Sequence, residues 1–141
     1  MKEKCIIKVV GIQKDAEGTE NKIELVTEGT CYKKNKNFYI VYEESEISGM
    51  EGSTTTLKIE DGSKISMRRF GNLDIHLVFE KGKSYNSQYR TQYGDFDMEV
   101  FTKELDIMLC NKTQQGKIAI EYDLWVAGIA DSANELNIQL M

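Results

Sequence analysis

Polar and apolar residues alternate one by one along most of this chain, and that pattern restricts it to a fold made of β-strands. Successive side chains of a strand point to opposite faces, so a period of two buries one face and exposes the other to water. Antiparallel sheets have this arrangement. The alternation is clearest in two apolar series, which are Ile75, Leu77 and Phe79, and Ile118, Ile120, Tyr122, Leu124 and Val126.

Turn signals separate the alternating segments at short intervals. The strongest is Asp61-Gly62, a dipeptide that favours a two-residue hairpin. Others are Gly52-Ser53, Gly71-Asn72, Lys81-Gly82 and Gly94-Asp95. The chain therefore divides into about ten strands, a spacing typical of a β-sandwich or a closed barrel. We predict an all-β fold, an antiparallel closed or nearly closed β-barrel of about eight to ten strands, with residues 1–141 as a single domain.

Two segments need a separate interpretation. The apolar series that reaches Thr102 resumes at Leu105, one residue out of phase, which predicts a β-bulge near Lys103-Glu104. Near the C-terminus, residues 132–135 match the capping box of a helix, whereas the alternation over 132–140 indicates a strand. We favour the strand, because a strand at this position can cover the edge of the first strand and close the sheet.

Composition excludes several classes of partner and site. The net charge of −5 argues against nucleic acid, because phosphate binding requires concentrated lysine and arginine. No run approaches the ~18 apolar residues of a membrane helix, so we expect no membrane partner and a cytoplasmic location without a signal peptide. Cys5, Cys31 and Cys110 are widely spaced, which predicts three reduced thiols. With only one histidine besides, we expect no metal site and no cofactor.

A set of short motifs falls in one order along the chain and carries a resemblance. These motifs are Tyr42-Glu43, the threonine-rich Ser53 to Leu57, Arg69-Phe70-Gly71, Phe79, Tyr89-Arg90-Thr91, Tyr93-Gly94, Thr102 and Tyr122. From about Cys5 to Leu140 the chain resembles the YwiB-like family of small bacterial proteins, a domain of unknown function. The resemblance implies a calycin-like (lipocalin-like) β-barrel in a cytoplasmic bacterial setting. It implies no activity, cofactor or catalytic residue.

The residues themselves do not form a catalytic set. His76 is out of phase with Ile75 and Leu77, which places it on the solvated face of its strand. The carboxylates cluster at residues 43–46 and 95–99, in the pattern of a solvent-facing strand. We therefore expect a protein that is not an enzyme.

The interior of the predicted barrel holds one anomalous charge. Arg69 shares a face with Ile65 and Met67, whereas Arg68 shares the opposite, solvated face. A buried guanidinium needs partners for its five N–H donors. Those partners are either Glu43 and tyrosine hydroxyls, in a structural ion pair, or the carboxylate or phosphate of a ligand. The candidate ligand-binding residues are Tyr42, Glu43, Arg69, Phe79, Tyr89, Thr91, Thr102 and Tyr122.

Two classes of function remain open. The first is a binding module whose amphipathic interior, including the tyrosines at 85, 89 and 93, takes one small or anionic molecule. The second is a solid-core interaction protein that acts through its outer surface or as a homodimer. Trp125 belongs to the second hypothesis, because its phase places it on the outer face of its strand.

Overall fold

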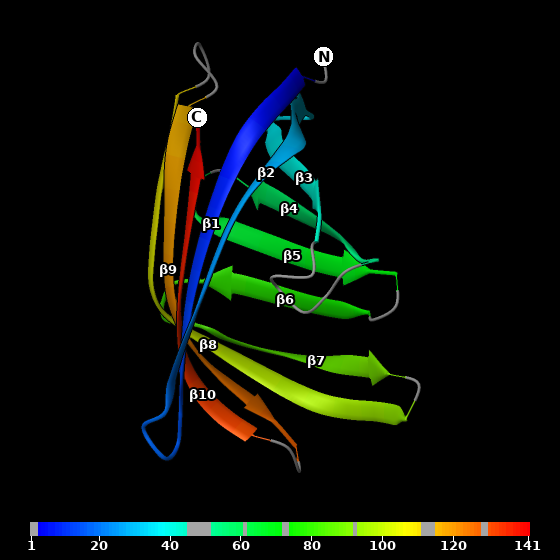
Figure 1. Cartoon of the computed structure of the whole chain (residues 1–141), viewed down its shortest axis with the longest axis vertical. Coiled ribbons are helices and arrows are strands. Elements are labelled where there is room, and N and C mark those ends of the chain that lie inside the picture. The colour runs from blue at the N-terminus through cyan, green and yellow to red at the C-terminus, as the bar shows by residue number, and fades with distance from the viewer. Residues whose placement is uncertain are drawn as a thin grey trace.

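Ten antiparallel strands form one sheet that curls into a nearly closed barrel (Figure 1). This computed structural model describes residues 3–44, 52–60, 62–71, 74–91, 93–110, 115–127 and 130–141. The strands are β1 (Glu3–Asp15), β2 (Glu20–Lys34), β3 (Asn37–Glu43), β4 (Thr54–Glu60), β5 (Lys64–Phe70), β6 (Ile75–Glu80), β7 (Ser84–Thr91), β8 (Gly94–Cys110), β9 (Gln115–Val126) and β10 (Ala130–Leu140). The predicted all-β barrel is confirmed.

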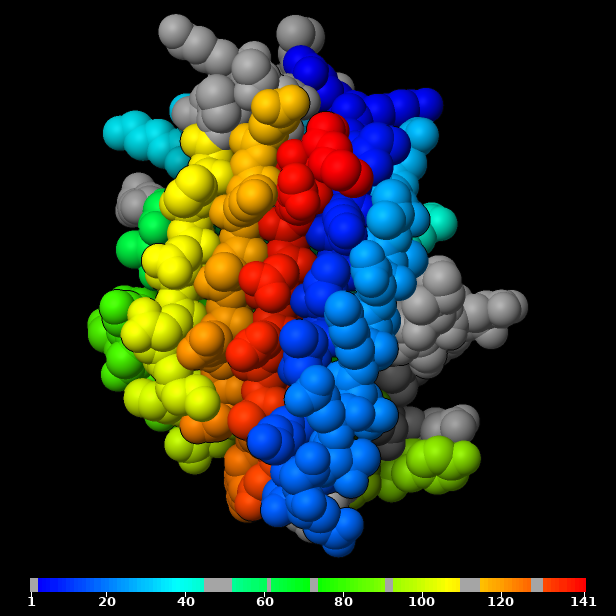
Figure 2. Space-filling view, turned by 60° about the vertical axis from the view of Figure 1, so that its left-hand side comes forward, coloured from blue at the N-terminus to red at the C-terminus, as the bar shows by residue number. Residues whose placement is uncertain are grey.

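The first and last strands lie side by side in the middle of the sheet. Its order is β6-β5-β4-β3-β2-β1-β10-β9-β8-β7, so every strand except β6 and β7 has two neighbours. β1 pairs with β10 from Ile7 opposite Leu140 to Asp15 opposite Ser132. The strand predicted at 132–140, and its pairing with the first strand, are therefore confirmed. The long strands β8, β9, β10, β1 and β2 together form one broad outer face (Figure 2).

The barrel closes incompletely between β6 and β7, along a line that we call the β6–β7 seam. These strands follow each other in the chain, yet the only backbone pairing beside them among the described residues is an isolated bridge between Asp74 and Arg90. The Arg90 amide donates to the Asp74 carbonyl at 3.1 Å, and the Asp74 amide donates to the Arg90 carbonyl at 3.4 Å. A side-chain hydrogen bond also joins the two strands, from the Tyr85 hydroxyl to Oε1 of Glu80 at 2.6 Å. On the other side of β7, the Thr102 amide donates to the Lys83 carbonyl at 3.2 Å and continues the β7–β8 ladder.

A bulge in β8 lies next to Thr102. The register between β8 and β9 shifts between Thr102 and Glu104, which confirms the bulge predicted at Lys103-Glu104. The extra residue restores the phase of the strand, so that Leu105 and Ile107 pack against the core on the same side as Thr102. The bulge thus keeps the apolar side chains of β8 on the inward face both before and after Lys103.

The core of the barrel is largely aliphatic, with Phe79 as an aromatic member. Its largest fully buried hydrophobic side chains come from almost every strand, and they are Ile7, Ile40, Leu57, Ile65, Met67, Phe79, Val100, Ile118, Ile120 and Ile138. All of them occupy the inward phase of their strands, as the alternation predicts. None of the described residues forms a helix that is long and apolar enough to cross a membrane.

The hairpin between β4 and β5 differs from the predicted two-residue turn. The first paired residues are Glu60 and Lys64, so the loop holds three residues. Gly62 has a φ of 68°, the left-handed region that glycine tolerates, and the Ser63 amide donates to the Glu60 carbonyl at 3.1 Å. A two-residue type I′ turn would also need a positive φ at Asp61, but Asp61 lies outside the described residues.

Two cysteines form a disulfide, which corrects the expectation of three reduced thiols. Cys5 lies opposite Gly29 and Cys31 lies opposite Glu3, so the two cysteines are diagonal neighbours on the inward face of β1 and β2. Their Cα atoms are 6.3 Å apart, within the range that a disulfide spans. Their separation of 26 residues gave no pairing signal in the sequence, because the β1–β2 register creates the contact. The side chain of Cys110 lies outside the described residues.

Reduction of the Cys5–Cys31 disulfide should lower the free energy of unfolding by about 3 kcal/mol, because a cross-link over a loop of this length restricts the unfolded chain. Urea denaturation with and without a phosphine reductant measures the difference. The double variant Cys5→Val with Cys31→Val is the control, and its midpoint should not respond to the reductant. Equal midpoints for the wild type, together with three titratable thiols, would contradict the disulfide.

Candidate functional site

Arg69 points into the barrel near the end of β5. Ile65 and Met67 precede it at alternate positions and are buried, so the pleat of the strand directs Arg69 inward. The neighbouring Arg68 is exposed, and its Nε lies 3.7 Å from the Asp74 carboxylate. The orientation predicted for the two arginines is therefore confirmed.

A buried carboxylate and a threonine hold the guanidinium of Arg69. Its Nε is 3.3 Å from Oε1 of Glu44 and donates a hydrogen bond to Oγ1 of Thr55 at 3.2 Å. The Thr55 hydroxyl in turn donates to Oε1 of Glu44 at 2.6 Å. The side chain of Glu44 is 2% exposed and that of Arg69 is 17% exposed. The charge of Glu44 is thus compensated from both sides, which a carboxylate in this position requires.

The strand register places these groups in one row. Tyr42 of β3 lies opposite Thr55 of β4, and Thr55 lies opposite Arg69 of β5. The three inward side chains are therefore cross-strand neighbours on one face of the sheet. Glu44 follows Tyr42 by two positions and shares its inward phase, immediately after β3 ends.

The partner of Arg69 is Glu44 and not Glu43, which corrects the prediction. Tyr42 is buried inside the barrel, so strand alternation turns Glu43 outward, where it is exposed, and returns Glu44 to the interior. A set that contained both Tyr42 and Glu43 could not lie on one face of a regular strand. Glu43 is therefore not a residue of the barrel interior.

The environment of Tyr42 keeps its hydroxyl protonated. Burial raises the pKa of Tyr42 to about 12, and the Glu44 carboxylate adds to the rise. The charge of Arg69, and hydrogen bonding with Arg69 and Thr55, oppose it. Because the hydroxyl keeps its proton at neutral pH, Tyr42 can serve this cluster as both donor and acceptor.

A second group of predicted residues adjoins the first across the interior. Thr102 of β8 lies opposite Tyr122 of β9, and the Tyr122 ring packs against Phe79 with centroids 4.8 Å apart. Burial raises the pKa of Tyr122 and the charge of Arg69 opposes the rise, so the two groups interact electrostatically. Oγ1 of Thr102 and Oγ of Ser53 are buried and have no hydrogen-bond partner among the described residues.

The inward side chains differ in how completely they are buried. Aliphatic inward residues are almost fully buried, for example Ile7, Ile40, Leu57, Ile65, Ile118 and Ile138. Thr55 and Thr102 are equally buried, whereas Arg69 keeps 17% of its side chain exposed. Several further side chains are partly buried and pack against the core, and these are Phe38, Tyr85, Tyr89, Leu105, Ile107, Leu109, Tyr122, Leu124 and Val126.

Two of the three tyrosines predicted to face inward do so. Tyr85 and Tyr89 pack against the core, and the Tyr85 hydroxyl donates to Oε1 of Glu80 at 2.6 Å. Tyr93 lies beyond β7 and is 84% exposed, so its predicted inward position is wrong. Thr91 ends β7, but its side chain lies outside the described residues.

Sequence reasoning missed three polar residues of this interior, which are Glu44, Ser53 and Thr55. Thr55 is in phase with Leu57 and Ile59, and all three are buried, so alternation alone could have placed it inside. Glu44 and Ser53 lie just outside their strands, where alternation gives a weaker signal. The backbone pairs them directly, because the Glu44 amide donates to the Ser53 carbonyl at 2.9 Å.

The described residues include no group of three or more His, Cys, Asp or Glu side chains that could hold a metal ion. His76 is exposed on β6, opposite Arg68 of β5. The chemistry available in the interior is therefore that of a guanidinium, a carboxylate and several hydroxyls, which suits recognition of a polar group.

Comparison with known proteins identifies the family. Residues 7–138 match the family described as a domain of unknown function (DUF1934). The chain belongs to the DUF1934 family. A curated relative, the uncharacterized beta-barrel protein YwiB of Bacillus subtilis (strain 168), is 27% identical over 123 residues, which cover 86% of this chain and 82% of that protein. The predicted resemblance is thus confirmed for this DUF1934 member.

A solved structure confirms the fold. The crystal structure of the YwiB protein from Bacillus subtilis matches with a TM-score of 0.85 at 23% identity, over 99% of this chain and 91% of that one. At this identity the likeness concerns the barrel alone. The lipocalin-like relationship implied by the resemblance stays a prediction.

Replacement of Arg69 by methionine should destabilise the protein by about 3 kcal/mol, because it leaves the Glu44 carboxylate buried without its counter-charge. Adding Glu44→Gln to Arg69→Met should restore most of that loss, since the amide carries no charge. Chemical denaturation of both variants measures the two effects.

Arg68→Met is the matched control, because Arg68 is exposed and its ion pair with Asp74 lies at the surface. It should change stability by no more than about 0.5 kcal/mol. If Arg69→Met is no more costly than Arg68→Met, the buried pair does not have the structural role described above.

Proposed function

We propose that this protein is a non-enzymatic binding module that takes one small anionic, amphipathic ligand in the barrel interior beside Arg69. The observation that carries the proposal is the asymmetric burial of the ion pair. The Glu44 side chain is 2% exposed, while Arg69 in front of it is 17% exposed. The guanidinium is thus fixed by a buried carboxylate and keeps part of its own surface accessible.

The contacts of Arg69 support an anionic ligand in particular. The contacts to Glu44 and Thr55 both use Nε, and the Tyr42 hydroxyl also hydrogen-bonds with Arg69. A guanidinium carries five N–H donors in all, more than these protein partners use. Two parallel N–H donors match the oxygens of a carboxylate or phosphate. Glu44 already fixes the orientation of the Arg69 side chain. The guanidinium would therefore be largely preorganised for a ligand.

The surroundings of Arg69 support an amphipathic ligand. Tyr89 and Tyr122 present partly buried rings that offer apolar contact with a polar tip. The unpaired Thr102 hydroxyl supports the proposal further, since a buried polar group without a protein partner is commonly bound to water or to a ligand. The proposal includes a calycin-like (lipocalin-like) barrel architecture, a cytoplasmic location and no cofactor.

The alternative function, an interaction protein that acts through its outer face or as a homodimer, has one observation in its favour. Trp125 is 47% exposed on the outer face of β9, as its phase predicted. An exposed tryptophan fits a contact surface, because tryptophan is enriched at protein–protein interfaces relative to the rest of the surface.

A thermal-shift comparison of small acids with their neutral amides tests the proposed ligand class. Benzoate, phenyl phosphate and indole-3-acetate should raise the melting temperature of the wild type, whereas benzamide and indole-3-acetamide should not. A ligand at 100 times its Kd adds about 2.7 kcal/mol to stability. Native mass spectrometry of the purified protein adds a search for a ligand that remains bound.

The variant Arg69→Met with Glu44→Gln should lose every shift that the acids produce, while Arg68→Met should keep it. A shift of equal size in all three proteins would place the acids elsewhere on the surface. A response to the amides as large as the response to the acids would contradict recognition by a guanidinium.

A further inference from the structure

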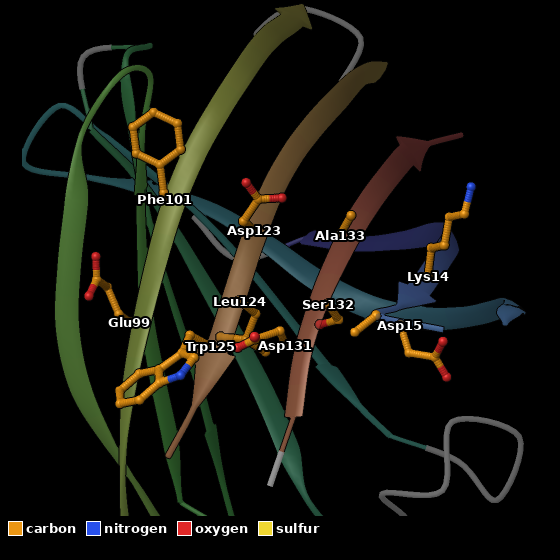
Figure 3. Close-up of a pocket in the computed structure, with 11 residues that line it drawn as sticks. Lys14, Asp15, Glu99, Phe101, Asp123, Leu124, Trp125, Asp131, Ser132 and Ala133 are labelled. Carbon is orange, nitrogen blue, oxygen red and sulfur yellow. The ribbon is translucent and has the colours of Figure 1, made fainter. Parts of the chain in front are cut away.

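A groove of about 400 Å³ crosses the outer face of the barrel, over β8, the end of β9 and the start of β10, and beside the turn after β1 (Figure 3). We call it the Trp125 groove. Its charged lining residues are Lys14, Asp15, Glu99, Asp123 and Asp131, four carboxylates against one ammonium group, and Phe101 and Trp125 supply its aromatic surface. It lies on the outer side of the sheet, whereas the Arg69 cluster lies inside the barrel, so the two sites are separate.

The groove has an aromatic surface that water reaches. Trp125 is 47% exposed and Phe101 is 38% exposed, and they belong to the neighbouring strands β9 and β8. Phe101 lies opposite Asp123, two residues from Trp125, so the two aromatic side chains are diagonal neighbours. Exposed aromatic area of this kind is enriched where proteins bind partners.

Two carboxylates flank the indole, one on each side. The register places Glu99 of β8 opposite Trp125, and Asp131 of β10 opposite it from the other side. Cross-strand neighbours of this kind have Cβ atoms about 5 Å apart. Figure 3 shows Trp125 between these two residues.

The negative charge that remains available is concentrated at Trp125. Asp123 forms a salt bridge with Lys103 at 3.3 Å, and the Asp15 carboxylate accepts hydrogen bonds from two backbone amides of its own turn. Within the described part of the chain, neither Glu99 nor Asp131 forms a salt bridge. An aromatic face between two unpaired carboxylates is suited to a cation.

We propose that the Trp125 groove binds a basic segment of a partner protein, with an arginine side chain stacked on the indole of Trp125. The guanidinium would lie against the aromatic face while its N–H donors reach Glu99 and Asp131. Arginine fits better than lysine, because its planar group stacks on aromatic rings and pairs with carboxylates through two parallel donors. The groove has room for roughly one or two residues, at the lower end of the usual size of binding pockets.

Charge complementarity selects a foreign partner over a second copy of this chain. A two-fold dimer interface brings one patch against the same patch of its partner. Here that contact would place the Glu99 and Asp131 carboxylates of one copy against those of the other, and the chain as a whole carries a net charge of −5. Like charges in an interface oppose association, whereas a basic segment is attracted by the same field.

The only tryptophan of the chain is in the groove, so its fluorescence reports binding there directly. We would titrate the full chain with acetylated tetra-arginine amide. The expected result is a saturable change in Trp125 emission, with at least tenfold weaker binding by the variant Glu99→Gln with Asp131→Asn. Tetra-lysine should bind more weakly than tetra-arginine.

The matched control is Glu28→Gln with Asp106→Asn, which removes the same charge from exposed positions outside the groove. Its affinity should stay within threefold of the wild type. The variant Arg69→Met with Glu44→Gln should bind the peptide like the wild type, which separates this site from the proposed interior site.

Three results would overturn the proposal. Equal weakening in the control and in the groove variant would mean that the peptide responds only to net charge. A change in Trp125 emission on raising the protein concentration without peptide would identify a second copy as the occupant. Absence of a saturable response to tetra-arginine would exclude a basic segment.

Discussion

The pairing of the first strand with the last is the contact on which the barrel depends. Nine residue pairs join β1 to β10, from Ile7 with Leu140 to Asp15 with Ser132. This ladder links segments at opposite ends of the chain, and it converts two separate meanders into one sheet. The aliphatic core forms inside it, the Arg69 cluster lies further round the same sheet, and the Trp125 groove crosses its outer side. A barrel without this ladder would have neither the enclosed interior nor the broad outer face.

Features that depend on local alternation were accessible from the sequence. Arg69 and Arg68 are adjacent and chemically identical, yet the phase of Ile65 and Met67 was enough to place one inside and the other outside. The outward Trp125 follows from the same rule. The bulge at Lys103 was predictable too. The apolar pattern changes phase by one residue there, and a β-bulge accommodates one extra residue in a strand.

Features that depend on strand register, or on chain just beyond a strand, were not accessible. Cys5 and Cys31 meet only because β1 and β2 pair with one particular offset, which alternation does not determine. Glu44 lies one residue past β3, so the choice between it and Glu43 required the inward phase of Tyr42 to be carried beyond the strand. The position of the β6–β7 seam followed from no local pattern, since a tight turn between two strands ordinarily predicts a paired hairpin.

The β6–β7 seam determines where the barrel can open with the least disturbance. Opening at this line breaks the Asp74–Arg90 bridge and the hydrogen bond between Tyr85 and Glu80, whereas opening between β1 and β10 would break a long ladder. The turn at 81–83 keeps the two strands tethered, so they close again without a long-range search of the chain. Local and sub-global opening of proteins involves their least stable regions. β6 pairs with β5, the strand that carries Arg69. The opening of lowest free-energy cost therefore occurs one strand away from the buried ion pair and leaves the β1–β10 ladder intact.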